Sequence, residues 1–132
     1  MKKTLILMLS IFLSTMFLSV NAQKPAAKWN TPDKYVKMKA VKLTPDEAKT
    51  GKDLYNKNCK SCHGGSGMGD GTKAAGLKTP MLPLNRKEFK SVAAGDKYYR
   101  SFVGRDEMPN FEKKITSEKD RWAIIEYIGT FK

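Results

Sequence analysis

Residues 59–63 read Cys-Lys-Ser-Cys-His, and this short motif restricts what the chain can fold into more than any other feature. Cys59 and Cys62 are the only cysteines of the 132 residues, and His63 is the only histidine. Two thiols at this spacing can close a disulfide, act as a redox pair, bind a metal or anchor a cofactor. The rest of the sequence has to decide among these possibilities.

The first 22 residues have the pattern of an export signal. Lys2 and Lys3 precede an apolar run at 5–20, and small residues allow cleavage after Ala22. A membrane-spanning helix needs about 20 apolar residues, and this run has 16, with serines among them. We therefore expect cleavage and a periplasmic location, with an uncleaved membrane anchor as the alternative. Exported thiols oxidise unless something claims them.

The charge of the chain favours some partners over others. The net charge is +12, and without residues 1–22 it is +10, from 23 Lys and Arg against 13 Asp and Glu. Nucleic acid is a poor candidate because the chain carries an export signal and its lysines are scattered. A strong field of one sign steers encounters with the opposite sign. We expect an acidic protein surface as partner, and a membrane only if the signal is retained.

The segment 23–43 is predicted to be an extended, lysine-rich arm. It holds six lysines and two prolines and shows no periodicity. Four apolar residues in it, Trp29, Tyr35, Val36 and Met38, are candidates for pinning part of the arm to the domain surface. The folded domain is expected over residues 44–132.

The domain begins and ends with predicted helices. Thr44 and Glu47 form a capping box around a helix that starts at Pro45 and delivers the cysteines at its end. Ser117 caps a last helix whose apolar stripe is Trp122, Ile124, Ile125, Ile128 and Phe131. Residues 64–85 are expected to form a loop, and residues 88–104 one or two short helices that end at Gly104. No alternating strand pattern is evident, so the predicted class is all-α.

In this context the motif favours covalent haem. C-x-x-C-H is the attachment pattern of c-type haem, in which Cys59 and Cys62 form thioethers and His63 binds the iron. A structural zinc site wants four protein ligands, and the motif supplies three. A thioredoxin-like pair would precede a helix in a βαβ unit, whereas this pair follows a helix. A plain disulfide is the remaining alternative.

Methionine is the expected sixth ligand of the iron, because His/Met ligation suits an electron carrier. Met38 lies on the arm, and Met68 follows His63 too closely to cross the ring. Met81 lies among prolines and leucines and fits core filler better. Met108 is followed by proline in a short loop with an apolar flank. We therefore predict Met108 as the ligand.

Residues 44–132 resemble a class I c-type cytochrome. The resemblance rests on "GKDLYNKNCKSCHG", "GRDEMPNF" and "WAIIEYIGTF". It implies orthogonal helices wrapped around one covalently attached haem c, with Gly51 and Tyr55 crossing the last helix near Ile125, Tyr127 and Ile128. It also implies a loop proline whose carbonyl accepts the other ring proton of the histidine, and Pro80 fits that pattern better than Pro83.

The expected function is transfer of single electrons between redox partners, not catalysis. Such partners include an oxidase, a quinol-oxidising complex or a periplasmic reductase, and the carrier itself is expected to be a monomer. A haem-based gas-binding protein or a redox-enzyme subunit with a labile sixth ligand is the alternative. Apolar side chains are expected to exclude water from the haem: Leu54, Leu77, Leu82, Leu84, Phe102, Phe111 and Ile125.

Overall fold

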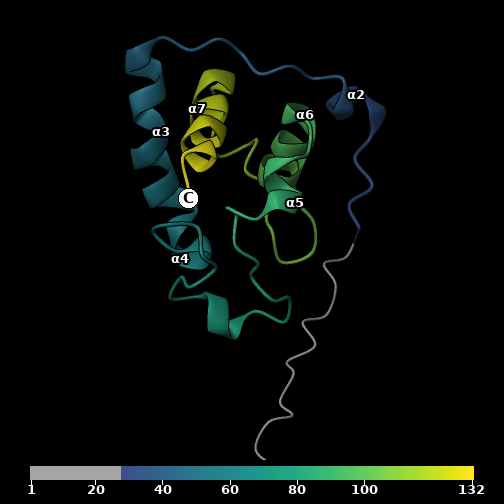
Figure 1. Ribbon diagram of the computed structural model, residues 1–132, viewed down its shortest axis with the longest axis vertical. Helices are drawn as coiled ribbons and strands as arrows, with labels where there is room; N and C mark the ends of the chain where they lie inside the picture. The colour runs from purple at the N-terminus through teal and green to yellow at the C-terminus, as the bar shows by residue number, and fades with distance from the viewer. Residues whose placement is uncertain (1–27) are drawn as a thin grey trace, which may run out of the picture.

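The computed structural model describes residues 28–132, which form helices and loops without a strand (Figure 1). The expected signal at 1–22 and the first residues of the arm lie outside this part. Within 28–132 no helix has the length and apolarity needed to cross a membrane. The all-α prediction is confirmed. The elements are α2 (Asp33–Val36), α3 (Pro45–Asn58), α4 (Lys60–His63), the 3-10 turn η1 (Ala74–Gly76), α5 (Lys87–Lys90), α6 (Ala94–Tyr98), the π-helical turn η2 (Tyr99–Val103) and α7 (Glu118–Gly129).

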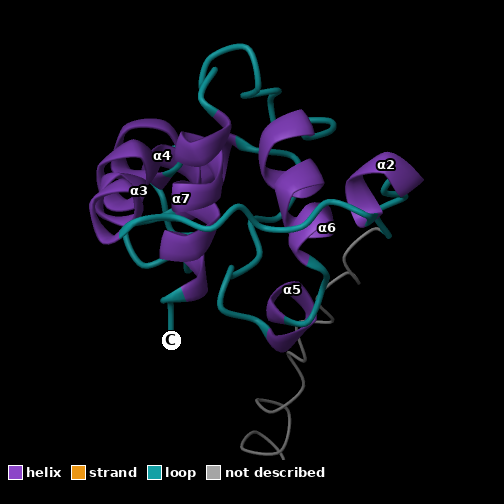
Figure 2. Ribbon diagram, turned by 90° about the horizontal axis from the view of Figure 1, so that it is seen from above, coloured by secondary structure: helices purple, strands orange, loops and turns teal. Residues whose placement is uncertain are grey.

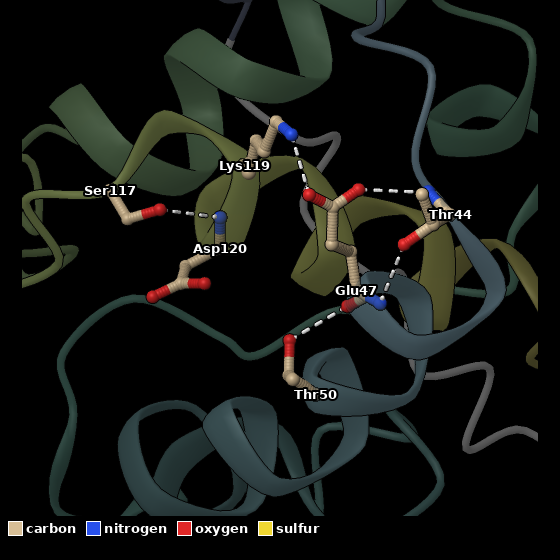
Figure 3. A network of polar contacts seen from close by, with 6 residues as sticks. All are labelled: Thr44, Glu47, Thr50, Ser117, Lys119 and Asp120. Carbon is tan, nitrogen blue, oxygen red and sulfur yellow. Dashed lines mark hydrogen bonds and ion pairs between the residues drawn. The ribbon is translucent and has the colours of Figure 1, made fainter.

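Helix α3 begins with the predicted capping box. The Thr44 hydroxyl accepts the Glu47 amide at 3.3 Å, and the Glu47 carboxylate accepts the Thr44 amide at 2.8 Å. The second carboxylate oxygen of Glu47 binds Lys119 Nζ at 2.5 Å (Figure 3). Ser117 caps α7 by accepting the amide of Asp120 at 3.2 Å. The starts of the two long helices are therefore tied together.

The two long helices lie side by side (Figure 2), and their closest approach is at Gly51. A Cβ added to Gly51 would lie 2.1 Å from the carbonyl oxygen of Ala123, so no larger residue fits. Tyr55 packs its ring 5.4 Å from that of Tyr127. The expectation that Gly51 and Tyr55 face the last helix is confirmed, although Gly51 meets Ala123 rather than Ile125.

Part of the core lies between α7 and the α6–η2 unit, beside the more extensive contact of α7 with α3. Tyr98 and Trp122 pack with their ring centroids 5.2 Å apart, and both are buried. On α7 Trp122, Ala123 and Ile124 are all buried, while Ile125 is half-buried. The buried face of α7 therefore includes Ile124 fully and Ile125 only in part. The contact with Gly51 explains this, because it brings the backbone at Ala123 against α3.

The segment 28–43 contains α2, and its last part crosses one end of the molecule from α2 to α3 (Figure 1). Tyr35 on α2 stacks on Tyr98, with centroids 6.2 Å apart, and also contacts Tyr99 at 4.9 Å. Val36 points outward and is 47% exposed. Trp29, Tyr35 and Met38 thus contact the domain as expected, whereas Val36 does not bury its side chain.

Candidate functional site

The Cys-x-x-Cys-His motif is presented from one helical turn. Cys59 ends α3, and its carbonyl accepts the amides of Cys62 at 3.2 Å and His63 at 2.9 Å. Gly64 then takes a φ of +81°, which turns the chain away from the helix axis. Both cysteines carry free, partly buried thiols. The first helix therefore delivers two thiols and an imidazole within five residues, as the sequence predicts.

The protonation states at the motif suit a neutral imidazole next to a neutral Cys59 thiol. Burial lowers the pKa of His63 to about 4 and raises the pKa of the Cys59 thiol to about 12. Zinc binds thiolates, and within residues 28–132 no cluster of three or more His, Cys, Asp or Glu side chains could hold a metal. A neutral imidazole is the form that binds iron.

The loop after the motif folds back onto α4. The Tyr55 hydroxyl donates to the Gly64 carbonyl at 2.7 Å, and the Gly71 amide donates to the Cys62 carbonyl at 3.2 Å. A Cβ on Gly71 would lie 2.4 Å from the Ser61 carbonyl oxygen. Glycine is therefore needed for this close approach, which holds the loop beside the motif.

Three residues that the sequence offered as candidates, Met68, Pro80 and Met81, lie in this loop region. Nδ1 of His63 is buried and has no hydrogen-bond partner among the described residues. Pro80 is exposed, so the contact between Pro80 and His63 stays a prediction. Met68 is 46% exposed, while Met81 is half-buried.

Met108 lies in a tight turn that follows η2. Gly104 takes a φ of +69°, and the Met108 amide donates to the Arg105 carbonyl at 2.8 Å in an isolated antiparallel bridge. Beyond the turn, the Phe111 amide donates to the Phe102 carbonyl at 2.7 Å. The half-buried Met108 side chain is thus carried by a loop whose two ends are hydrogen-bonded. The two predicted ligands, His63 and Met108, thus sit on separate segments of the chain.

Sequence reasoning did not identify Glu107 as part of this site. Its carboxylate accepts the amides of Lys78 at 3.0 Å and Thr79 at 2.7 Å, which join the Met108 turn to the loop after the motif. These two amides lower the pKa of Glu107. Because the partners are backbone groups 28 and 29 residues away, no motif or spacing announces them.

The site residues fit a haem. A buried, unpartnered imidazole nitrogen and two free thiols on one turn are the groups that a c-type haem requires. Of the apolar residues expected around it, Phe102 is buried, whereas the others are half-buried and leave apolar surface to cover a flat group: Leu54, Leu77, Leu82, Leu84, Phe111 and Ile125. The donor set and its apolar surroundings therefore agree with the expected cofactor.

Comparison with known proteins points the same way. Residues 46–128 match the family described as "Cytochrome C oxidase, cbb3-type, subunit III". Over 91 residues the chain is 32% identical to the "Cytochrome bc1 complex cytochrome c subunit" of Corynebacterium diphtheriae, covering 68% of this chain and 29% of that protein. The protein of the same description from Corynebacterium efficiens is 31% identical, with 68% and 28% covered. The chain thus spans about three tenths of the length of these relatives.

Proposed function

Since this chain belongs to the Cytochrome C oxidase, cbb3-type, subunit III family and is an electron carrier with a cytochrome c domain, we propose that it carries single electrons in the periplasm with one haem c. The observation that carries the proposal is the single helical turn with two free thiols and a neutral imidazole whose Nδ1 is buried and unpartnered. Cys59 and Cys62 would form the thioethers. His63 and Met108 would be the axial ligands.

The residues of the chain fix the environment of this group. When bound, haem supplies an iron centre that takes up and releases one electron. His63 stays neutral at pH 7 because burial lowers its pKa to about 4. The apolar side chains, Leu54, Leu84 and Phe111 among them, exclude water, which favours the less charged state of the site. In this proposal the backbone carbonyl oxygen of Pro80 accepts a hydrogen bond from the remaining ring N–H of His63.

The proposed division of the chain is a signal at 1–22, an arm at 23–43 and the cytochrome domain at 44–132. The carrier is either free in the periplasm or held by an uncleaved signal. It acts as a monomer and catalyses no reaction of its own.

The proposed partners are redox proteins with acidic docking surfaces: an oxidase, a quinol-oxidising complex or a periplasmic reductase. The names of the relatives, which are subunits of a bc1 complex, support a partner of this class. The net charge of +12 supports electrostatic docking. Because salt screens such attraction, the rate of electron transfer should fall as ionic strength rises. A rate that is flat in salt would exclude electrostatic docking.

An absorption spectrum of the exported, haem-loaded protein tests the proposal. We expect low-spin bands, a weak long-wavelength band from Met bound to ferric iron, and no shift with carbon monoxide. The long-wavelength band should vanish in Met108→Ala and survive in Met81→Ala. A high-spin spectrum that shifts with carbon monoxide would favour a gas-binding protein or a redox-enzyme subunit instead. Absence of covalent haem would exclude both functions, and a disulfide between Cys59 and Cys62 would become the better interpretation of the pair.

A further inference from the structure

The segment before α2 contacts the turn that carries Met108. The guanidinium carbon of Arg105 lies over the indole ring of Trp29, 4.0 Å from the ring centroid. Arg105 Nη1 also donates to the carbonyl oxygen of Lys28 at 2.7 Å. A guanidinium over the face of an indole is the most favourable cation–π pair in proteins. One arginine is thus held by both the ring and the backbone of the arm.

Arg105 is coupled directly to Met108. Its carbonyl accepts the Met108 amide at 2.8 Å, and the two residues form the bridge that closes the turn. Gly104, just before it, lies so close that a Cβ there would be 2.1 Å from the Met108 carbonyl oxygen. Movement of the Arg105 backbone therefore moves the Met108 backbone.

Trp29 is itself fixed from the other side. Its ring meets that of Tyr99 edge to face, with centroids 6.1 Å apart, and Arg100 lies 5.8 Å from the same ring. Arg100 is paired with Asp96 at 2.5 Å, and Thr31 on the arm donates to the same carboxylate. The indole is thus braced against α6 and η2, elements of the core, before it reaches Arg105.

Downstream of Trp29 the arm is held a second time. The carbonyl oxygen of Tyr35 would lie 1.7 Å from a Cβ at Gly95, so the backbones of α2 and α6 touch. Tyr35 also stacks on Tyr98 and Tyr99. These contacts hold the arm in place without any help from Arg105, and the arm can therefore restrain Arg105 rather than follow it.

We propose that Trp29 is a positioning residue for Met108. By clamping the side chain of Arg105, it keeps the 105–108 turn closed and the Met108 side chain directed to the iron. The proposal rests on the proposed function in one respect, namely that Met108 is the ligand. It gives the arm a role at the haem that its lysine-rich composition does not suggest.

The first test compares Trp29→Ala with the unaltered, haem-loaded full chain. Imidazole is titrated into the ferric protein, and displacement of Met108 is followed by loss of the long-wavelength band. We expect Trp29→Ala to bind imidazole about ten-fold more tightly, the ratio that one partly desolvated cation–π contact supplies. Trp29→Phe keeps an aromatic face and should restore most of the difference.

Two control variants separate positioning from general loss of stability. Ile128→Val trims a buried side chain of α7, which belongs neither to the 105–108 turn nor to the arm, and should lower the unfolding temperature without changing imidazole affinity. Val36→Ala alters an exposed residue of the same arm and should change neither. If Trp29→Ala lowers stability but leaves imidazole affinity equal to that of Ile128→Val, the proposal is wrong.

Hydrogen exchange at the Met108 amide gives a readout that does not depend on ligation. This amide is bonded to Arg105, so Trp29→Ala should speed its exchange about ten-fold, whereas Val36→Ala should not. If the long-wavelength band survives in Met108→Ala, the ligand assignment in the proposed function fails. The exchange rate then decides by itself whether Trp29 holds the turn, and an unchanged rate overturns the proposal.

Discussion

The α3–α7 junction and the Met108 turn are held in different ways. At the junction two helices meet backbone to backbone at Gly51, and Tyr55 and Ile124 beside it are fully buried. The turn is held by hydrogen bonds with distant segments: Arg105 donates to the Lys28 carbonyl, and Glu107 accepts the amides of Lys78 and Thr79. Burial supplies most of the free energy of folding. We therefore expect damage at the junction to cost stability, and damage at the turn to cost ligation.

Gly51→Ala should have the largest effect on stability. The new Cβ would lie 2.1 Å from the Ala123 carbonyl oxygen, which is backbone and can move only if the helices separate. We expect a loss of about 3 kcal/mol in the free energy of unfolding, measured by denaturant titration of the haem-loaded protein. Gly129→Ala on α7, where nothing lies within 4 Å, is the matched control and should be neutral or slightly stabilising. Equal stabilities of the two variants would contradict the close crossing.

Gly104→Ala should disturb the Met108 turn rather than the α3–α7 junction. Its φ of +69° is unfavourable for alanine, and the Cβ would lie 2.1 Å from the Met108 carbonyl oxygen. We expect a stability loss of about 2 kcal/mol, smaller than for Gly51→Ala, together with loss of most of the long-wavelength band at pH 7. Gly51→Ala should keep that band. The control is Gly76→Ala, where nothing lies within 4 Å. If the less stable variant loses more of the band, ligation follows global stability and the distinction between the regions fails.

The two regions also differ in how far the sequence predicts them. The helices at the junction follow from local signals: the Thr44 and Glu47 capping box, the Ser117 cap and the apolar period of the last helix. The motif residues follow from spacing alone. The contact of Arg105 with Lys28 joins residues 77 positions apart, and that of Glu107 with Thr79 joins residues 28 apart. Such pairs depend on the completed fold, so no periodicity reveals them.

Glu107→Ala should give a smaller effect that is confined to the turn. It frees the amides of Lys78 and Thr79 and leaves the core unchanged. Because the carboxylate is exposed, the change in unfolding temperature should be small. Imidazole affinity of the ferric protein should rise about five-fold, the size expected from two exposed hydrogen bonds that each contribute at the low end of the usual net range. Glu112→Ala, in the chain just beyond the turn, serves as the matched loss of a carboxylate. Equal imidazole affinities in the two variants would show that Glu107 does not hold the turn.

The smallest effect is expected from Glu47, whose contribution to stability is present at neutral pH and lost in acid. Its pKa is lowered to about 2, first by the hydrogen bond from Lys119 and then by the Thr44 amide. A carboxylate with a lowered pKa in the folded state stabilises the fold above the ordinary value near 4.5, and this contribution is lost as the pH falls from there through about 2. Glu47→Gln should therefore lower the unfolding temperature slightly at pH 7, flatten its fall across that window, and match the unaltered chain once the pH is below about 2.

Lys119→Ala separates the causes of this pH dependence. It removes the first contributor to the lowered pKa but keeps the Thr44 capping contact, so the loss of stability should be complete at a higher pH than in the unaltered chain. The long-wavelength band at pH 7 should remain in both variants, because the contact joins Glu47 on α3 to Lys119 on α7 (Figure 3) and involves neither Arg105 nor Met108. A pH profile of unfolding that is identical in all three proteins would show that the ion pair does not couple the helix starts. A loss of the band in either variant would mean that the junction and the turn are not energetically separate, which is the distinction that all five substitutions test.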